Sequence, residues 1–154
     1  MIVVIAELPI SVYNFPHMAA NTRFAVAVHI ATVLARNGAE FTSSDRIAKS
    51  VCTNPVVIRR ILAALHQARI IESQLGKGGG ARLAQSPSKL TLDKIFDAIE
   101  PEGLFAAPSK PANKACAVSC CMKDEMAKIF CETEKAVRAK LKSMTISDLV
   151  HSIR

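Results

Sequence analysis

The sequence is poor in aromatic residues, in acidic residues and in long hydrophobic runs. It has no tryptophan and one tyrosine, and aromatic residues make up 5% of its 154 residues. The apolar run Ile2–Ala6 is far shorter than the roughly 18 residues that a membrane-spanning helix needs. No Lys or Arg precedes Arg23, so the positively charged start of a secretory signal is missing. We therefore expect a cytoplasmic protein that has no membrane partner.

What the sequence does contain describes an aliphatic globular protein. Half of its residues are hydrophobic and 21% are charged, which excludes disorder for most of the length. Its length suits one domain, or a small domain with an appended element. The five cysteines are an odd number, and three of them crowd into residues 116–121. A disulfide framework is therefore not expected.

The positive charge is concentrated in one half of the chain. Twenty Lys and Arg face thirteen Asp and Glu, which gives a net charge of +7 with His neutral. Residues 20–85 hold nine of the basic and three of the acidic residues, so this half carries +6 of the +7. Such a balance favours a polyanionic partner, with double-stranded DNA first. The nearly neutral remainder is expected to serve assembly or sensing.

The spacing of apolar residues predicts three helices in the basic half. Asn21 or Thr22 caps the first, and Gly38 ends it. Thr42 or Ser43 caps a short second helix. Asn54 as N-cap and Pro55 at the first helical position start a third helix that runs to about Ala68. The residues expected to be buried in the first two helices are Phe24, Ala27, Val28, Ala31, Leu34, Ala35, Ile47, Ala48 and Val51.

The third predicted helix has two unlike faces. One stripe is expected to be buried and consists of Val57, Ile61, Ala64 and Leu65. The opposite side is basic near its start and holds Val56, Arg59, Arg60, Ala63 and Gln67. Two short helices with a tight turn and a basic second helix fit a helix-turn-helix, whose second helix enters the major groove N-terminus first. The candidate DNA contacts are Thr42, Ser43, Ser44, Thr53, Asn54, Pro55, Val56, Arg59 and Arg60.

The segment after the third helix predicts a wing. Ile70–Ser73 and Ala81–Ala84 can pair as strands around the loop Gln74–Gly80, which contains four glycines. We expect its DNA contacts to be Lys77, Gly78, Gly79 and Arg82. A phosphate cradle is the competing interpretation, but it needs Lys followed by Ser or Thr and a helix, whereas Lys77 is followed by three glycines.

The second half predicts a long helix after a connecting loop. Thr91 caps a helix that buries Ile95, Phe96 and Ile99, and residues 101–117 are rich in Pro, Ala, Ser and Lys. From about Ser119 to Ser143 one helix of roughly 24 residues spans about 36 Å. We expect its apolar stripe to pack against the same helix of a second copy, the alternative being packing on the first helix of its own chain. The stripe is Met122, Met126, Ile129, Phe130, Thr133, Val137 and Leu141. A short helix follows from Thr145.

These expectations divide the chain into four parts. They are an N-terminal extension (1–20), a winged helix-turn-helix domain (21–100), a cysteine-containing loop (101–118), and a dimerisation helix with a C-terminal helix (119–154). The fold class is mainly α with a small β-hairpin wing. Periodic structure begins at Asn21, so we expect translation to begin at Met18. The alternative is that the extension docks on the body as an arm.

The cysteines leave three interpretations open. Cys116 and Cys120 are four residues apart, so on a helix their thiols share one face, close enough for a disulfide or a soft metal ion. Cys131 lies about 16 Å beyond Cys120 along a straight helix, so one cluster cannot hold both. Ordinary thiols, a thiol redox switch, or a metal or iron–sulfur site on Cys116, Cys120 and Cys121 remain. We expect Cys52 to be a small core residue and the histidines His29 and His66 to be structural.

Three stretches carry a family resemblance. Asn21–His29, Thr53–Arg60 and Leu90–Phe96 resemble the Rrf2 family of bacterial winged-helix transcription regulators, most of all its YwnA-like branch. The resemblance covers nearly everything from Asn21 onward. It implies a homodimer, not an enzyme, that binds a palindromic operator, usually as a repressor. The contacts it implies are the helix that begins at Asn54 and the wing around residues 77–80.

Some members of that family hold an iron–sulfur cluster on three cysteines before the dimer helix and sense iron, nitric oxide or redox state. The cysteines here are more closely spaced than in those members, and Cys116 matches the single cysteine of the YwnA-like branch. We therefore expect a sequence-specific DNA-binding regulator without a bound cofactor. The alternative is a thiol, metal or iron–sulfur sensor whose DNA binding is controlled by Cys116, Cys120 and Cys121.

Overall fold

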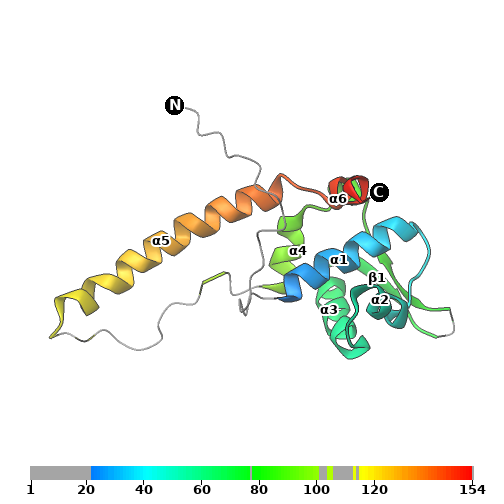
Figure 1. Ribbon diagram of the computed structural model, residues 1–154, viewed down its shortest axis with the longest axis horizontal. Coiled ribbons are helices and arrows are strands. Elements are labelled where there is room, and N and C mark those ends of the chain that lie inside the picture. Colours follow the sequence, from blue (N-terminus) through cyan, green and yellow to red (C-terminus); the bar gives the residue numbers. More distant parts are fainter. Residues whose placement is uncertain (1–21, 77, 101–103, 106–112, 114, 154) are drawn as a thin grey trace.

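The computed structural model describes residues 22–76, 78–100, 104–105, 113 and 115–153. Within these residues the chain forms six helices, a hairpin and a short 3₁₀ segment, and one long helix projects from the body that the other elements form (Figure 1). They are α1 (Thr22–Asn37), α2 (Ser44–Val51), α3 (Pro55–Gln67), β1 (Ile71–Gln74), β2 (Gly80–Leu83), η2 (Pro87–Lys89), α4 (Leu92–Ile99), α5 (Ala117–Lys142) and α6 (Ile146–Ser152). This architecture confirms the mainly α fold with a hairpin wing and a long helix. The predictions about Met18 and residues 1–20 lie outside the described residues.

The core forms where α1, α3, α4 and the hairpin meet. Within α1, Ala27, Ala31 and Leu34 are buried as predicted, and Ile30 joins them. The predicted burial of Ile95, Phe96 and Ile99 on α4 is confirmed. Other members of the core are Ile47, Ile58, Ile61, Leu65, Ile70, Ile71, Ala81, Leu90, Leu92 and Ile146.

The turn between α2 and α3 is held by caps at both ends. Ser43 Oγ accepts a hydrogen bond from the Arg46 amide at 3.3 Å, and Asn54 Oδ1 accepts one from the Val56 amide at 2.8 Å. Between them Cys52 has the left-handed conformation (φ 56°), which lets the Thr53 amide donate to Ala48 O at 3.0 Å. The prediction that Cys52 is a core residue is wrong, because the left-handed residue ends α2 and leaves its thiol exposed.

The face of α3 that packs inward differs by one residue from the prediction. Ile58, Ile61 and Leu65 are buried, whereas Val57 is 39% exposed. The assignment of Val57 to the buried stripe is therefore wrong. The observed stripe runs i, i+3, i+7 from Ile58, and Val57 lies about 100° away from it around the helix. Val57 instead joins Val56, which is 49% exposed, at the start of the outer face.

The hairpin pairs Ile71 with Leu83, Glu72 with Arg82, Ser73 with Ala81 and Gln74 with Gly80 in antiparallel register. Its first strand begins one residue later and its second one residue earlier than predicted. Thr42 adds a bridge to Ala81, with reciprocal backbone hydrogen bonds of 2.9 Å. A side chain at Gly80 would place Cβ 2.3 Å from Thr42 O, so this close approach requires glycine.

The base of α5 is tied to the body by α4 and α6. The Leu92 amide donates to Met144 O at 3.0 Å, and the Ile146 amide donates to Leu90 O at 2.9 Å. α5 has 26 residues, about 39 Å at 1.5 Å per residue, and starts two residues before the predicted position. Figure 1 shows its N-terminal part extending away from the body. No helix among the described residues combines the length and the apolar character that crossing a membrane requires.

Candidate nucleic-acid interface

The candidate DNA surface is formed by the starts of α2 and α3 and by the β1–β2 hairpin. α2 and α3 pack together, and the Thr42–Ala81 bridge joins the residue before the α2 cap to the hairpin. The three segments therefore form one continuous part of the body. Ser43, Asn54, Val56, Arg59, Arg60 and Gly78 are exposed there, while Ser44, Thr53, Pro55, Gly79 and Arg82 are half-buried.

Arg59 is held by the N-terminus of α2. Its Nε donates to Ser44 Oγ at 3.4 Å, and its guanidinium lies 3.6 Å from Asp45 Oδ1. The Arg59 and Asp45 side chains are 62% and 68% exposed, so this ion pair is weak. The contacts restrict where the guanidinium lies without burying it. Arg59 can exchange them for a guanine edge or a phosphate at small cost.

The start of α3 presents methyl groups beside a hollow. Val56 and Val57 are both exposed on its first turn. The adjacent cavity of about 710 Å³ is lined by α2 and by the turn, including Lys49 and Thr53. A short apolar surface flanked by donors suits the major groove, where thymine presents a methyl group and guanine presents acceptors.

Arg82 of the hairpin already forms an ion pair with Glu72. Arg82 donates through two nitrogens to Glu72 Oε2, at 3.0 and 2.8 Å, and its guanidinium lies 4.7 Å from the centre of the Phe41 ring. Because Glu72 and Arg82 face each other in the register, this pair fastens the two strands. Arg82 therefore stabilises the wing, and any contact that it makes with DNA competes with Glu72.

Other predicted contacts have structural surroundings of their own. Thr42 is 1% exposed, and its Oγ1 accepts a hydrogen bond from Asn37 Nδ2 at 2.9 Å, so its side chain supports the wing from inside. At Gly79 a side chain would place Cβ 2.2 Å from Gln74 O, so this glycine is required by the chain's own turn. Lys77 lies outside the described residues.

Sequence reasoning missed Leu75 at the tip of the wing. Its side chain is 96% exposed, the largest exposure among the large hydrophobic residues described. The available signal was an apolar residue between Gln74 and Gly76 in a loop that otherwise has polar residues and glycine. An exposed leucine on a wing can contact the sugars or base edges of a groove.

The apolar stripe of α5 divides into an uncovered and a covered part. Met122 and Ile129 are 49% and 52% exposed on the projecting half, where Val118 is 64% exposed as well. Phe130 stacks on Phe105 with ring centres 4.7 Å apart, and Leu141 packs against the core. Met126 and Val137 are half-buried and Thr133 is exposed.

The cysteines cluster at the start of α5. Cys116 is the N-cap, the Cys120 amide donates to Cys116 O at 3.1 Å, and the Cys120 thiol lies 3.6 Å from Asn113 O. All five cysteines are free and exposed. Within the part of the chain that the structure describes, no three His, Cys, Asp or Glu side chains gather so as to hold a metal ion. In this arrangement Cys116, Cys120 and Cys121 do not fit an iron or iron–sulfur group.

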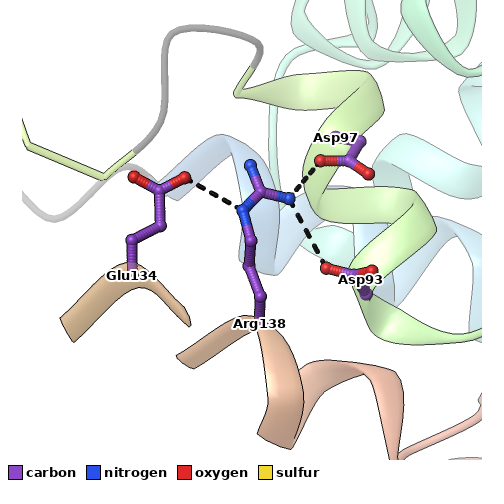
Figure 2. A network of polar contacts seen from close by, with 4 residues as sticks. All are labelled: Asp93, Asp97, Glu134 and Arg138. Carbon is purple, nitrogen blue, oxygen red and sulfur yellow. Dashed lines mark hydrogen bonds and ion pairs between the residues drawn. The ribbon is translucent and has the colours of Figure 1, made fainter. Parts of the chain in front are cut away.

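One arginine anchors α5 to α4 (Figure 2). Arg138 donates to Glu134 Oε1 at 2.9 Å and to Asp97 Oδ1, and its NH1 lies 3.5 Å from Asp93 Oδ1. The hydrogen bonds that Arg138 donates to Asp97 and then to Glu134 raise the pKa of Arg138 above its ordinary value, so it stays charged at every accessible pH. Its guanidinium also lies 5.2 Å from the centre of the Phe96 ring.

The fold and the surface together define a winged helix-turn-helix DNA-binding protein with a projecting helix. A family model described as Rrf2, iron-dependent transcriptional regulator, matches residues 20–152. The chain therefore belongs to the Rrf2 family, which is a family of transcriptional regulators and not of enzymes. Iron appears in that description, but the described residues do not provide a site that fits it.

Individual relatives support the same assignment. YwnA of Bacillus subtilis (strain 168), named as an HTH-type transcriptional regulator, is 34% identical over 134 residues, which span 86% of this chain and 98% of YwnA. A transcriptional regulator from Lactobacillus plantarum superposes with a TM-score of 0.70 at 26% identity, over 83% of this chain and 87% of that one. CymR (YrzC), the global cysteine regulator of B. subtilis, shares the fold with a TM-score of 0.65 at 20% identity, over 91% of this chain and 100% of CymR.

Proposed function

We propose that this protein is a homodimeric repressor that binds a palindromic operator through the candidate DNA surface. The observation that carries the proposal is the exposed start of α3, where Val56, Val57 and Arg59 reach solvent and Arg59 lines the same hollow as Ser73 of the wing. A helix that presents a cation and methyl groups at its N-terminal turn can read base edges, while the wing and the helix caps position it on phosphates.

The charge distribution supports DNA as the partner. Residues 20–85 carry +6 of the net +7, and these residues build the helix-turn-helix and the wing. Contacts with phosphates release counterions, so affinity should fall steeply between about 50 and 200 mM salt. An affinity that is indifferent to salt over this range would contradict the proposal.

The deciding experiment is selection of random DNA fragments by the purified protein, followed by sequencing. A sequence-specific regulator enriches one motif, and a two-fold symmetric dimer enriches an inverted repeat whose half-sites lie about one helical turn apart. Enrichment of a single unrepeated half-site would exclude the dimeric binding mode. A reporter gene placed behind the enriched motif then distinguishes repression from activation.

The uncovered half of α5 supports a second copy as partner. Val118, Met122 and Ile129 form an exposed apolar edge on a helix that extends beyond its own body. An isologous contact between two such edges would cover both at once. Light scattering during gel filtration should then give twice the chain mass.

A thiol sensor is the second candidate function. It is favoured by the position of Cys116 and Cys120, which cap and continue the first turn of the same helix with free, exposed thiols. Oxidation to a disulfide between them would distort that turn. Peroxide should then abolish operator binding, a thiol reductant should restore it, and Cys116→Ser should remove the response. Unchanged binding after peroxide treatment would leave the cysteines as ordinary thiols.

A further inference from the structure

A cavity between α1, α2 and α6 lies outside the candidate DNA surface. It measures about 450 Å³, within the range of about 300–1,000 Å³ that is usual for small-molecule sites. Most of its wall comes from α1, with Ser50 of α2 on one side and Leu149 of α6 and the C-cap residue Ile153 on the other. α6 packs against α1, so the cavity lies between packed helices.

The wall combines an apolar lining with a few polar groups. The apolar lining includes Val28, Val33, Leu149 and Ile153. His29 and Ser50 face each other, with His29 Nε2 3.0 Å from Ser50 Oγ. Such a combination binds an apolar body and orients one polar end, as small-molecule sites generally do.

The charge of the wall is of one sign. Arg36 lines the cavity, and none of the described residues that line it is Asp or Glu. Arg36 also forms no ion pair within the described part of the chain. A guanidinium with no carboxylate side chain among the described residues of its cavity complements an anion, carboxylates above all.

We propose that this cavity binds a small organic anion, a carboxylate on an apolar body, and that the bound anion controls DNA binding. The carboxylate pairs with Arg36 and accepts hydrogen bonds from the polar groups beside it, while the apolar body lies against Val33, Leu149 and Ile153. The second half of this proposal rests on the proposed function.

The route to the DNA surface is short. Ser50 lies on α2, the helix whose N-terminal residues Ser44 and Asp45 hold Arg59. α6 follows directly after α5 and is joined to the start of α4 by the Thr91–Thr145 bridge. An anion in the cavity therefore touches both the helix that positions α3 and the helix that fastens α5. A difference of ligand affinity between two arrangements of α2 is sufficient to couple the sites.

Calorimetric titration of the full-length protein without DNA tests the binding site, with octanoate, octanol and octylamine as probes. We expect saturable octanoate binding, with octanol and octylamine at least about tenfold weaker, because only octanoate gains the charged hydrogen bond. Arg36→Gln should weaken octanoate binding by about tenfold. Arg23→Gln removes the same charge from α1 outside the cavity and should change nothing.

A variant that fills the cavity with a large side chain tests the binding site independently. Ala25 is an exposed residue of the wall, so Ala25→Trp should block octanoate binding while leaving the thermal unfolding midpoint near that of the parent. Equal binding of octanol and octanoate, equal effects of the two arginine variants, or no binding at all would each overturn the site.

The link to DNA has its own readout. Saturating octanoate should shift the affinity for the selected operator, and the operator should shift octanoate affinity by the same factor. If octanoate binds but neither ligand changes the affinity for the other, the cavity remains a binding site and the proposed control of DNA binding is wrong. A protein that binds octanoate but enriches no DNA motif would contradict the proposed function and not the cavity.

Discussion

At the scale of single residues, the candidate DNA surface depends on where Arg59 is held. Its contacts with Ser44 and Asp45 join the recognition side of α3 to the start of α2. The Arg59 and Asp45 side chains are both exposed, so the contacts orient the guanidinium more than they stabilise the fold. Arg59 is thus preorganised for an acceptor that approaches from solvent.

Arg59→Ala should reduce operator affinity by about 1–3 kcal/mol and relax the preference at one base-pair position, if the guanidinium reads a base. Fluorescence anisotropy on the operator and on single-base variants measures both effects. Lys140→Ala, which removes one positive charge in the last turn of α5, outside the candidate DNA surface, serves as the control. A uniform loss across all sequences would assign Arg59 to a phosphate instead.

Cys52 lies at a position where the backbone favours glycine. A non-glycine residue in the left-handed region costs about 1–2 kcal/mol, part of which glycine returns through its larger entropy in the unfolded chain. Cys52→Gly should therefore raise the free energy of unfolding by about 0.5–1 kcal/mol. Chemical denaturation followed by circular dichroism measures it, with Cys52→Ala as the control for loss of the thiol. Equal stability of the Gly and Ala variants would show that the φ of 56° is not strained.

At the scale of elements, the Arg138 network decides how firmly α5 is attached. Arg138 lies between three carboxylates from α4 and α5 and packs on Phe96, which in turn meets Phe24 of α1 edge-on, with ring centres 5.5 Å apart. The contacts thus run from α5 through α4 to the first helix of the DNA-binding body. A partly buried network of this kind resists any change in the angle of α5.

Arg138→Met should lower the free energy of unfolding by about 1–3 kcal/mol, because it removes charged hydrogen bonds and leaves Asp93 Oδ1 buried without its ion-pair partner. Methionine keeps an unbranched chain beside Phe96. The matched control is Lys128→Met, whose ion pair with Glu125 is largely exposed and should contribute less than about 0.5 kcal/mol. Urea denaturation measures both. Equal effects would show that the network is ordinary surface.

The N-cap of α6 makes the stability of the fold depend on pH. Asp148 accepts hydrogen bonds from the Thr145 hydroxyl and amide, and these lower the pKa of its carboxyl below the ordinary value. Because the pKa of Asp148 is lower in the folded than in the unfolded chain, its ionised carboxyl stabilises the fold at pH values above the unfolded pKa of about 3.9. This stabilisation is lost as the pH falls through the pKa of the folded state. The melting temperature of Asp148→Asn should therefore lie below that of the parent at pH 7 and approach it below about pH 4. The control is Asp124→Asn, whose melting temperature should follow that of the parent over the whole pH range. A difference in melting temperature between Asp148→Asn and the parent that does not change with pH would contradict the capping role.

Local rules predicted the parts of this structure that depend on local chemistry. The caps Ser43 and Asn54, Pro55 at the start of α3, and the glycine-rich turn of the wing all follow from residue types at fixed offsets. The burial of Ile58 instead of Val57 depends on the side from which α1 and α4 pack. The exposure of Leu75 depends on its place at the end of the hairpin, and the local signal was a single apolar residue in a loop of polar residues and glycine.

Partners across the fold were beyond local prediction for the same reason. Arg82 was expected to be a DNA contact because it is basic and flanks a loop, but its partner Glu72 is set by strand register. Arg138 was not singled out at all, since Asp93 and Asp97 are more than 40 residues away along the chain. The predicted DNA contacts themselves stay predictions until a complex is measured.

At the scale of the whole molecule, the projecting helix would set the spacing of two DNA-binding bodies in the proposed dimer. A single body offers one α3 to one half-site, whereas two bodies joined through α5 offer two α3 helices with a fixed separation. Linking two half-sites in this way raises affinity by roughly 10²–10⁴ over a single contact without any new interaction with a base. In the proposed dimer, the exposed edge formed by Val118, Met122 and Ile129 would therefore be coupled to operator affinity without touching DNA.

Ile129→Glu places a carboxylate on that edge, where a second copy would have to bury it. We expect a folded monomer, because Ile129 is 52% exposed within its own chain, and a loss of about a hundredfold or more in affinity for the inverted repeat. Affinity for an isolated half-site should stay within about twofold of the parent's, since the candidate DNA surface is unchanged. The control is Ala127→Glu, which puts the same acid two residues earlier, on the opposite side of α5 at about 100° per residue. Light scattering measures the oligomeric state, and anisotropy measures affinity for the half-site and for the full operator. A dimer that persists in Ile129→Glu, or a monomer that still binds the full operator tightly, would place the contact between copies elsewhere on the molecule.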